Sequence, residues 1–327
     1  MSSSTTGNLI AAGHAGALAL AVAALRRSDL VGMPTETVYG LAADAGNATA
    51  VAKVFAAKGR PRFNPLIVHV ADVDAAASIG IFPAEALKLA ARFWPGPLTM
   101  VVPKRDGAPV ADLALAGLAS VAIRVPAHPI ARALLAEFGG PVVAPSANRS
   151  GHVSATTAKH VADDLGDAVA VILDAGPSAI GLESTIVGFG AGRPVLLRAG
   201  AIPRGTIEEV LGVPLAMPEL NADSPTAPGM LASHYAPAAR VRIGVTSVEH
   251  GEALLAFGPT LPANAQKAVA LINLSPTGDL TEAAARFFSA LRELDAKAAA
   301  IAVAPVPEAG LGEAINDRLR RAAAPSR

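Results

Sequence analysis

The sequence predicts an α/β protein with a twisted, open, mixed sheet in its larger part and a second, smaller α/β domain. Three observations lead to this prediction. Apolar residues make up 52% of the 327 positions, which is enough to fill more than one buried core. Short β-branched runs alternate with segments of helical periodicity, the pattern of an α/β sheet. Several neighbouring runs follow one another without a helix between them, which favours a mixed sheet over a purely parallel one.

The elements of the larger sheet are expected within residues 1–213. Helices are expected where apolar residues recur every three or four positions, with Gly59 as a C-cap after one of them and Pro129 at the start of another. The expected helices span residues 15–27, 48–58, 84–93, 129–138 and 157–165. The expected strands span residues 30–33, 66–70, 98–102, 121–125, 142–144, 169–174, 184–187 and 195–198.

Residues 214–239 differ in character from the chain before them. They hold five prolines and show no clear periodicity, which predicts a semi-rigid linker. Residues 240–327 return to alternating apolar runs and are expected to form a small α/β domain. Its strands are expected at residues 241–245, 268–274 and 299–304, and its helices at residues 282–295 and 312–322.

Composition limits the functional classes. Lys plus Arg and Asp plus Glu are equal at 27 each, so any basic site must be local, and the total charge gives no sign of nucleic-acid binding. The absence of cysteine excludes disulfides and thiolate zinc sites. The apolar stretch at residues 15–25 is too short to span a bilayer, and the start of the chain lacks a positive signal-peptide region. We therefore expect a soluble, cytoplasmic protein with no membrane contact.

Three cations, Lys58, Arg60 and Arg62, follow an expected helix at alternating positions. Alternate residues of an extended segment point the same way, so all three are expected to face one pocket. An ammonium binds phosphate as a compact charge, and a guanidinium holds phosphate or carboxylate through two parallel bonds. Pro61 and Pro65 indicate a stiff loop. A solvent-exposed basic loop is the alternative that these residues also allow.

Hydroxyl and amide side chains follow two of the expected strands. Ser146 and Asn148 come after one strand, where they can bind phosphate or ribose together with backbone N–H groups. Thr35 and Thr37 come after another and can position a small polar substrate. A purely local polar turn is the alternative for the first pair, and a capping role is the alternative for the second.

Arg124, Arg198 and His69 each end an expected strand. A guanidinium in such a place suits a carboxylate or phosphate, and an imidazole can bond a substrate carboxylate or carbonyl. A solvent-exposed charge is the alternative for each arginine. Because polar groups at strand ends build ligand sites in α/β sheets, we expect these side chains to converge on an anionic ligand such as a nucleoside triphosphate.

Several common chemistries are excluded by motif. Ser184 lies outside a G-x-S-x-G elbow and is not read as a hydrolase nucleophile. The chain has neither G-x-x-x-x-G-K-[ST] nor a regular G-x-G-x-x-G. The histidines lack zinc spacing, so we expect no protein metal site and only a divalent metal that arrives with the triphosphate. In the linker, Tyr235 can close over a ligand, with an inter-domain packing contact as the alternative.

Taken together, these motifs resemble one known family. The segments within residues 15–213 that closely resemble the YrdC-like family of threonylcarbamoyl-AMP synthases are PTETVYGL at 34–41, KGRP at 58–61, NPLIVH at 64–69, WPGPLT at 94–99, RVP at 124–126, PSAN at 145–148, ESTI at 183–186 and LRAG at 197–200. HYAP at 234–237 and GLGEAINDR at 310–318 resemble the long, two-domain form of that enzyme.

The resemblance implies a fold, a reaction and a set of site residues. The implied fold is a twisted open sheet with a concave basic face, followed by a Rossmann-like domain. The implied reaction makes threonylcarbamoyl-AMP and pyrophosphate from L-threonine, bicarbonate and ATP, with Mg²⁺ arriving with ATP and no tightly bound cofactor. Other proteins then transfer the group to an adenosine of tRNA. The implied roles are catalysis for Lys58 and Arg60; L-threonine binding for Thr35, His69, Arg124, Ala144 and Ser184; and ATP binding for Lys58, Arg60, Asn64, Ser120, Ser146, Asn148, Ser154, Arg198 and Tyr235.

Two other functions remain open from the sequence. The first is a protein that binds tRNA or double-stranded RNA on the basic concave face, which would need no threonine pocket and would show a steep salt dependence. The second is a carbamoyl-handling domain with a different acceptor. That role belongs to much larger chains with zinc-finger modules, and the absence of cysteine argues against it here.

Overall fold

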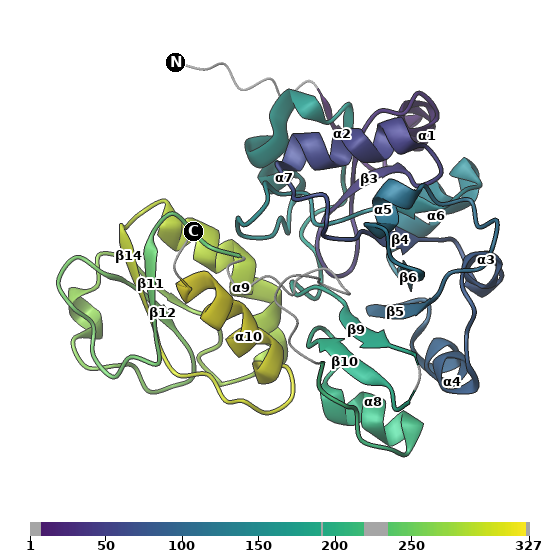
Figure 1. The fold of residues 1–327 in the computed structure, drawn as a ribbon. Coiled ribbons are helices and arrows are strands. Elements are labelled where there is room, and N and C mark those ends of the chain that lie inside the picture. The colour runs from purple at the N-terminus through teal and green to yellow at the C-terminus, as the bar shows by residue number, and fades with distance from the viewer. Residues whose placement is uncertain (1–7, 191, 219–234, 325–327) are drawn as a thin grey trace.

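The computed structural model describes residues 8–190, 192–218 and 235–324 (Figure 1). Most of the expected linker, residues 219–234 with His234, lies outside this part of the chain. The domain boundaries inferred from the sequence stay a prediction. The described residues form two sheets.

The larger sheet has ten strands in the order β1-β8-β2-β3-β7-β4-β6-β5-β9-β10 among the described residues. Neighbouring strands run in parallel, as β4 and β6 do, or antiparallel, as β5 and β6 do, so the prediction of a mixed sheet is confirmed. The strands are β1 (Leu9–Ala11), β2 (Val31–Met33), β3 (Gly40–Asp44), β4 (Ile67–His69), β5 (Leu98–Pro103), β6 (Ser120–Arg124), β7 (Val142–Val143), β8 (Val171–Asp174), β9 (Thr185–Gly188) and β10 (Val195–Arg198).

Four of the eight helices described around this sheet begin at a residue whose side chain caps the first turn. Asn47 accepts hydrogen bonds from the backbone N–H groups of Thr49 and Ala50, and Gly59 ends the same helix with a φ of 60°. These helices are α1 (Ala17–Arg26), α2 (Ala48–Lys58), α3 (Val73–Ile79), α4 (Ala84–Phe93), α5 (Asp112–Leu115), α6 (Pro129–Phe138), α7 (Ala158–Leu165) and α8 (Arg204–Leu211).

Five elements of the larger sheet and its helices were not expected from the sequence: β1, β3, α3, α5 and α8. Strand β3 has the sequence GLAAD, whose small residues carry no β-branched or aromatic signal. It forms because both neighbours in the sheet, β2 and β7, pair with it. Tertiary pairing therefore decided what local propensity could not.

The second sheet contains four strands, in the order β11-β14-β12-β13, and all of its pairs are parallel. This confirms the smaller α/β unit expected after the linker, although strand β12, with sequence ALLA, was missed. Helix α9 packs on the sheet, and α10 packs on β11 and α9. Its elements are β11 (Arg240–Ile243), β12 (Ala253–Ala256), β13 (Leu271–Asn273), α9 (Leu280–Asp295), β14 (Ala300–Val303) and α10 (Gly312–Ala323).

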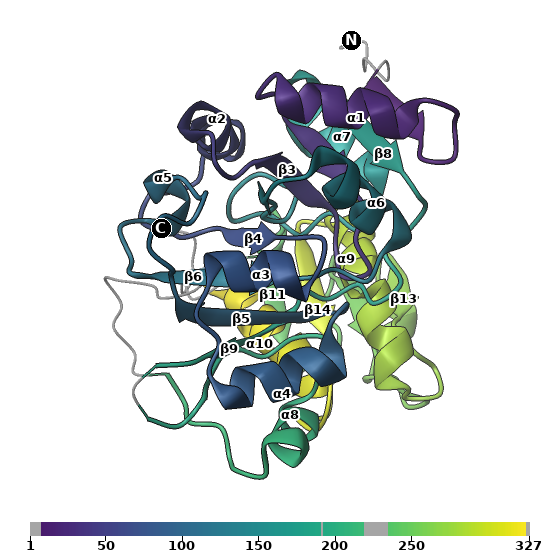
Figure 2. The ribbon, with the colours of Figure 1, turned by 90° about the vertical axis from the view of Figure 1, so that its right-hand side faces the viewer.

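The central strands of the larger sheet lie between two layers. Helices α3 and α4 cover one side of β4, β6 and β5, and the second sheet with α9 and α10 lies on the other side (Figures 1 and 2). Within the described ranges, no helix combines the length and apolar character needed to cross a membrane.

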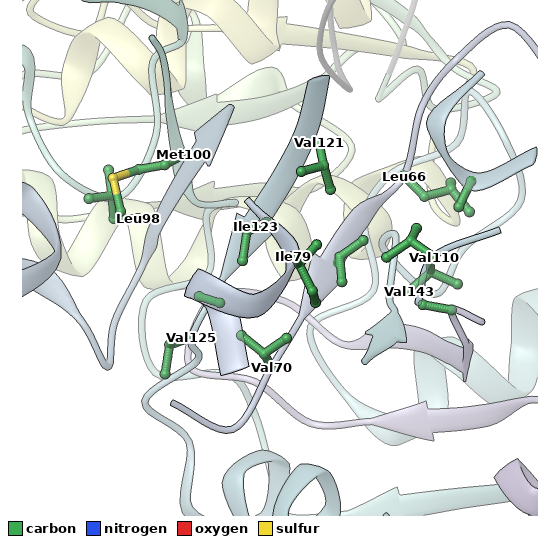
Figure 3. Packing of buried hydrophobic residues seen from close by; sticks show 14 of the residues in the cluster. Leu66, Val70, Ile79, Leu98, Met100, Val110, Val121, Ile123, Val125 and Val143 are labelled. Atoms are coloured by element: carbon green, nitrogen blue, oxygen red, sulfur yellow. The ribbon is translucent and has the colours of Figure 1, made fainter. Parts of the chain in front are cut away.

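Alternation along β4 and β6 gives each layer its own set of side chains. Val68 and Ile123 are partners across the two strands, and both are fully buried in the core under α3 and α4, where Figure 3 shows Ile123 packed near Ile79 and Val121. Their neighbours His69 and Arg124 are also partners and point to the opposite face. The same two strands thus build both the core and the face that looks towards the second sheet.

The second unit contacts the larger sheet closely. Gly181 has a φ of +73°, and a Cβ added to it would lie 2.4 Å from the carbonyl oxygen of Ala284 in α9. Among the described residues, three ion pairs cross the seam between the two units: Arg292 to Asp164 at 2.9 Å, Arg204 to Glu313 at 2.6 Å and Arg318 to Glu183 at 3.1 Å. The loop that carries Gly181 is therefore fixed by α9 as well as by its own sheet.

We expect Ile123→Ala to lower the free energy of unfolding by about 2–5 kcal/mol, because it opens a cavity among fully buried side chains. Urea denaturation monitored by circular dichroism measures this change. The matched control is Ile81→Ala, since that side chain is 50% exposed and should change stability by about 0.5 kcal/mol or less. Equal losses in the two variants would contradict the assigned core.

Candidate active site

One pocket forms on the face of the larger sheet that looks towards the second sheet, at the ends of β4, β6 and β10. Its empty volume is about 510 Å³ when the part open to solvent is included. The pocket is lined by Thr37, Val38, Arg60, Ile67, His69, Arg124, Ala144, Pro145, Ser146, Glu183, Ser184, Arg198 and Tyr235.

Arg124 is held in place by three hydrogen bonds. It donates to the carbonyl oxygen of Gly96 at 3.2 Å, to the Thr37 hydroxyl at 2.8 Å and to the Glu36 carboxylate at 2.6 Å. The other Glu36 oxygen accepts from the backbone N–H groups of Ala127 and His128. A guanidinium has five N–H donors, so two remain for a ligand. Burial raises the pKa of Glu36, but the Arg124 charge and the hydrogen bonds from Arg124 and the backbone together outweigh it, so the net pKa is lowered.

Arg198 also lines the pocket and is held by Ser184. It donates to the Ser184 carbonyl oxygen through Nε at 3.1 Å and Nη2 at 2.9 Å, and Nη2 also lies 3.1 Å from the Ser184 hydroxyl. That hydroxyl shares a 2.7 Å hydrogen bond with Thr99. The Nη1 group of Arg198 makes no hydrogen bond within the described residues, which leaves two donors at the pocket.

Arg60 is the third buried guanidinium of the pocket. It donates to the carbonyl oxygens of Asn64 at 3.3 Å and Pro65 at 3.0 Å. Burial lowers its pKa to about 10, which still leaves it charged at neutral pH. Arg62 is exposed and outside the pocket, so the expectation that three alternating cations share one pocket is wrong for Arg62. The chain turns after Gly59 instead of continuing as an extended segment.

The three arginines that line the pocket differ in whether a carboxylate balances their charge. In the described part of the chain, Arg124 pairs with Glu36, whereas neither Arg60 nor Arg198 has an ion-pair partner. Glu183 pairs with Arg318 instead. Arg60 and Arg198 are therefore buried cations whose hydrogen-bond acceptors are all neutral oxygens, an arrangement that favours an anionic ligand.

His69 adds a neutral polar group beside Arg124. Burial and then the Arg124 charge lower its pKa to about 3, so the imidazole is uncharged at neutral pH. Its Nδ1 lies 3.2 Å from the Ile67 carbonyl oxygen. The ring can therefore donate or accept a hydrogen bond in the pocket without adding positive charge.

Lys58 stands behind the pocket wall. Its ammonium is buried and donates to the main-chain oxygens of Ser146 and Asn148, so it fixes the turn after β7. Burial, followed by the nearby Arg60 charge, lowers its pKa well below the ordinary value. Lys58 does not line the pocket, and its catalytic role stays a prediction.

Besides Lys58, five predicted ligand contacts do not line the pocket. The Thr35 hydroxyl is used in the local turn, with Val38 among its partners, and the structure places Thr37 on the wall instead. Ser154 donates to Glu183 at 2.6 Å. Ser120 begins β6, about 13 Å from Arg124 at roughly 3.3 Å per residue, so it belongs to the far end of the strand.

Two amides, Asn64 and Asn148, complete that group. Asn64 is buried, and neither atom of its amide has a hydrogen-bond partner in the described part of the chain. Asn148 donates to two carbonyl oxygens, but its own side-chain oxygen has none. Unsatisfied buried polar groups are costly, so these three atoms indicate ligand or solvent contacts near the pocket.

The remaining predicted contacts do converge: Arg60, His69, Arg124, Ala144, Ser146, Ser184, Arg198 and Tyr235 all line the pocket. The sequence assigned no role to Glu36, Glu183 or Arg318. All three lie inside the motifs that carry the family resemblance, so the signal was present. What was missing was the pairing of carboxylates with arginines, which spacing along the chain does not reveal.

Comparison with known proteins agrees with this geometry. Residues 23–200 match the Sua5–YciO–YrdC family, described as "Telomere recombination", and residues 202–324 match "Threonylcarbamoyl-AMP synthase, C-terminal domain". The Bacillus subtilis threonylcarbamoyl-AMP synthase is 41% identical over 94% of this chain and 92% of its own length. The Pyrococcus abyssi synthase is 39% identical over 93% of both chains.

Solved structures show the same relationship. The crystal structure of P. abyssi Sua5 complexed with L-threonine has a TM-score of 0.85 at 38% identity and covers 94% of each chain. Escherichia coli YciO, at 21% identity and a TM-score of 0.50, shares the fold over 56% of this chain.

The fold and pocket therefore define an enzyme of the nucleotidyltransferase type. The chain belongs to the threonylcarbamoyl-AMP synthase family, in its two-domain Sua5 form. This finding favours the synthase over the RNA-binding alternative.

We expect the buried, neutral His69 to make stability pH-dependent. Its folded pKa of about 3 lies below the ordinary value of 6.5, so the unfolded chain binds the proton first as pH falls. Between pH 7 and pH 5 this group should cost the protein about 2 kcal/mol of unfolding free energy. Urea titrations at both pH values measure it.

In His69→Gln that contribution should vanish, so the variant should lose less stability than the parent on acidification. His250→Gln, at an exposed position, is the matched control and should behave as the parent does. The same pH dependence in the His69 variant and the parent would contradict the assignment.

Proposed function

We propose that the enzyme makes threonylcarbamoyl-AMP and pyrophosphate from L-threonine, bicarbonate and ATP in this pocket. The observation that supports it most is the division of charge: one guanidinium is already matched by a carboxylate, and two are not. An amino acid carries one carboxylate and can bind at an arginine that is already paired. A polyphosphate carries several negative charges and needs cations that no carboxylate neutralises. The relative in P. abyssi was crystallised with L-threonine, which supports threonine as a substrate here.

L-Threonine would bind on the Arg124 side of the pocket. The two remaining N–H donors of Arg124 suit a carboxylate, and Glu36 and Thr37 fix the direction in which they point. His69 and the Ser184 hydroxyl offer neutral polar contacts for the amine and hydroxyl of the substrate. Ala144 offers a small, apolar wall.

ATP would bind on the side of Arg60 and Arg198, whose free donors suit phosphate oxygens. The unpartnered amide of Asn64 adds a donor and an acceptor next to Arg60. Ser146 lines the same pocket, and Lys58 fixes its turn by donating a hydrogen bond to the Ser146 carbonyl oxygen. Contacts of ATP with Ser120, Asn148 and Ser154 remain predictions from the family resemblance.

The reaction needs positioning more than it needs a covalent enzyme intermediate. One C–N bond forms between the threonine amine and the bicarbonate carbon, and water leaves. One bond forms between a carbamate oxygen and the α-phosphorus, and the bond from that phosphorus to the bridging oxygen breaks, so pyrophosphate leaves. Arg60 and Arg198 would stabilise the charge that develops on the phosphates.

Magnesium is proposed only as an ion carried by ATP. No group of three or more His, Cys, Asp or Glu side chains gathers in the residues that the structure describes, and both carboxylates at the pocket, Glu36 and Glu183, already pair with arginines. This donor set fits an ion held mainly by phosphate oxygens and water. Bound in that way, Mg²⁺ would neutralise part of the phosphate charge.

Tyr235 closes one side of the pocket and is 2% exposed. A carbamate decomposes readily in water, so a closed wall would protect it. The product is an activated acyl group, and we expect its partners to be proteins that transfer it to tRNA. Direct contact between this chain and tRNA also remains a prediction.

The direct test measures pyrophosphate release with ATP, L-threonine and bicarbonate, leaving out one substrate at a time. Release should need all three, and mass spectrometry should detect threonylcarbamoyl-AMP. Release that continues without threonine would contradict the proposal.

We expect Arg60→Ala to lower kcat/KM for ATP by about 100-fold or more, because it removes a buried charge from the nucleotide side. The neighbouring Arg62→Ala is the matched control, since that side chain is exposed, and it should keep the parental rate. Steady-state pyrophosphate assays compare the two. Circular dichroism should show that both variants fold, and similar rates would rule out the assigned role of Arg60.

A further inference from the structure

Arg318 is a buried arginine that the reaction proposed above does not use. It lies in α10 of the second unit, is 0% exposed and has the largest volume among the fully buried side chains. A guanidinium so deeply buried requires partners for its charge and for its five donors. Its partners belong mostly to the other unit.

The main partner of Arg318 is Glu183, a residue that lines the pocket. Nε and Nη2 of Arg318 each lie 3.1 Å from one Glu183 oxygen, and the Ser154 hydroxyl donates to the other oxygen at 2.6 Å. Nη1 donates to the carbonyl oxygen of Ala199 at 2.6 Å and to Asp317 at 2.9 Å. Both oxygens of the Glu183 carboxylate are therefore occupied from outside the pocket.

Arg318 also supports Tyr235. Its guanidinium carbon lies 5.4 Å from the centre of the Tyr235 ring, and the Phe288 ring of α9 lies 5.6 Å from the same centre. Cation–π and aromatic contacts of this kind favour one ring orientation. The second unit thus contacts two parts of the pocket wall, a carboxylate and an aromatic ring.

The position of Glu183 matters because Arg198 is close to it. Ala199, whose carbonyl oxygen accepts from Arg318, directly follows Arg198 in the chain. Burial lowers the pKa of Arg198, while the Glu183 carboxylate raises it and the Arg318 charge lowers it. A Glu183 without Arg318 would be an unpaired buried anion beside an unpaired buried cation, and the two would attract each other strongly.

We propose that Arg318 is a positioning residue of the nucleotide subsite. It keeps the Glu183 carboxylate paired and the Tyr235 ring in place, so that the Arg198 guanidinium stays available for phosphate oxygens. The second unit thereby completes the active site. This inference rests on the function proposed above.

Another ion pair at the same seam provides a control. Arg204 pairs with Glu313 of α10 at 2.6 Å, and neither residue lines the pocket. If Arg318 only held the two units together, loss of either pair would have the same kind of effect. If Arg318 positions the nucleotide subsite, only its own loss should change the use of ATP.

The experiment compares Arg318→Met, Glu183→Gln/Arg318→Met and Arg204→Met in the full chain. We expect Arg318→Met to raise the KM for ATP by about tenfold or more, with the KM for L-threonine within about twofold of the parent. Arg124 and Glu36 on the threonine side are untouched. The double variant removes the stray carboxylate and should recover most of the loss in KM for ATP. Arg204→Met should leave both constants unchanged.

Three results would overturn the proposal: an unchanged KM for ATP in folded Arg318→Met, the same rise in Arg204→Met, or a double variant as impaired as the single one. Thermal melting checks folding. If Arg318→Met does not fold, Arg318→Lys replaces it and should raise the KM for ATP to a smaller extent, because it keeps the charge but loses the two-point contact. An unchanged value there would equally count against the role.

Calorimetry with a non-hydrolysable ATP analogue separates this inference from the function on which it rests. If the parent releases no threonine-dependent pyrophosphate but binds the analogue, the proposed reaction fails, and analogue binding by the variants still tests Arg318. Weaker binding in Arg318→Met, recovered in the double variant, would support the role. Equal binding in all variants would refute it.

Discussion

The need to compensate buried guanidinium groups governs this structure. Arg60, Arg124, Arg198 and Arg318 are each at most 8% exposed. A buried charge is tolerated only when it is paired or well hydrogen-bonded. Glu36 and Glu183 form ion pairs with Arg124 and Arg318. The other two guanidinium groups donate hydrogen bonds to carbonyl and hydroxyl oxygens. Arg60 and Arg198 have no carboxylate partner among the described residues, so an anionic ligand is expected beside them.

The same two strands carry both stability and chemistry. In β4 and β6, one set of alternating residues fills the apolar core, and the other set points His69 and Arg124 into the pocket. Because adjacent residues face opposite layers, the register of the two strands decides both sets at once. The hydrogen-bond ladder between β4 and β6 therefore fixes the spacing of the site with the rigidity of a packed sheet, while the loops only complete it.

Much of the fold was predictable because its patterns are local. The β-branched runs of β4 and β6 and the capped helix α2 satisfy propensity, periodicity and end signals together. Strands β3 and β12 were not predictable, since small residues in them become strands only through their neighbours. In the site, strand-end position correctly brought Arg124, His69 and Arg198 together. The choice of Thr37 over Thr35 depends on turn geometry, and the Glu183–Arg318 pair joins positions 135 residues apart, beyond any local signal.

The close approach at Gly181 has a consequence for how this protein can vary. With an imagined Cβ only 2.4 Å from a carbonyl oxygen of α9, the loop before Glu183 has no room for a side chain unless the helix backbone retreats. A larger residue at position 181 would push α9 away from the larger sheet, and the Glu183–Arg318 pair joins these same two units. Substitutions in one unit are consequently constrained by the surface of the other. A second unit taken from another protein would have to reproduce the shape of α9 as well as its contacts.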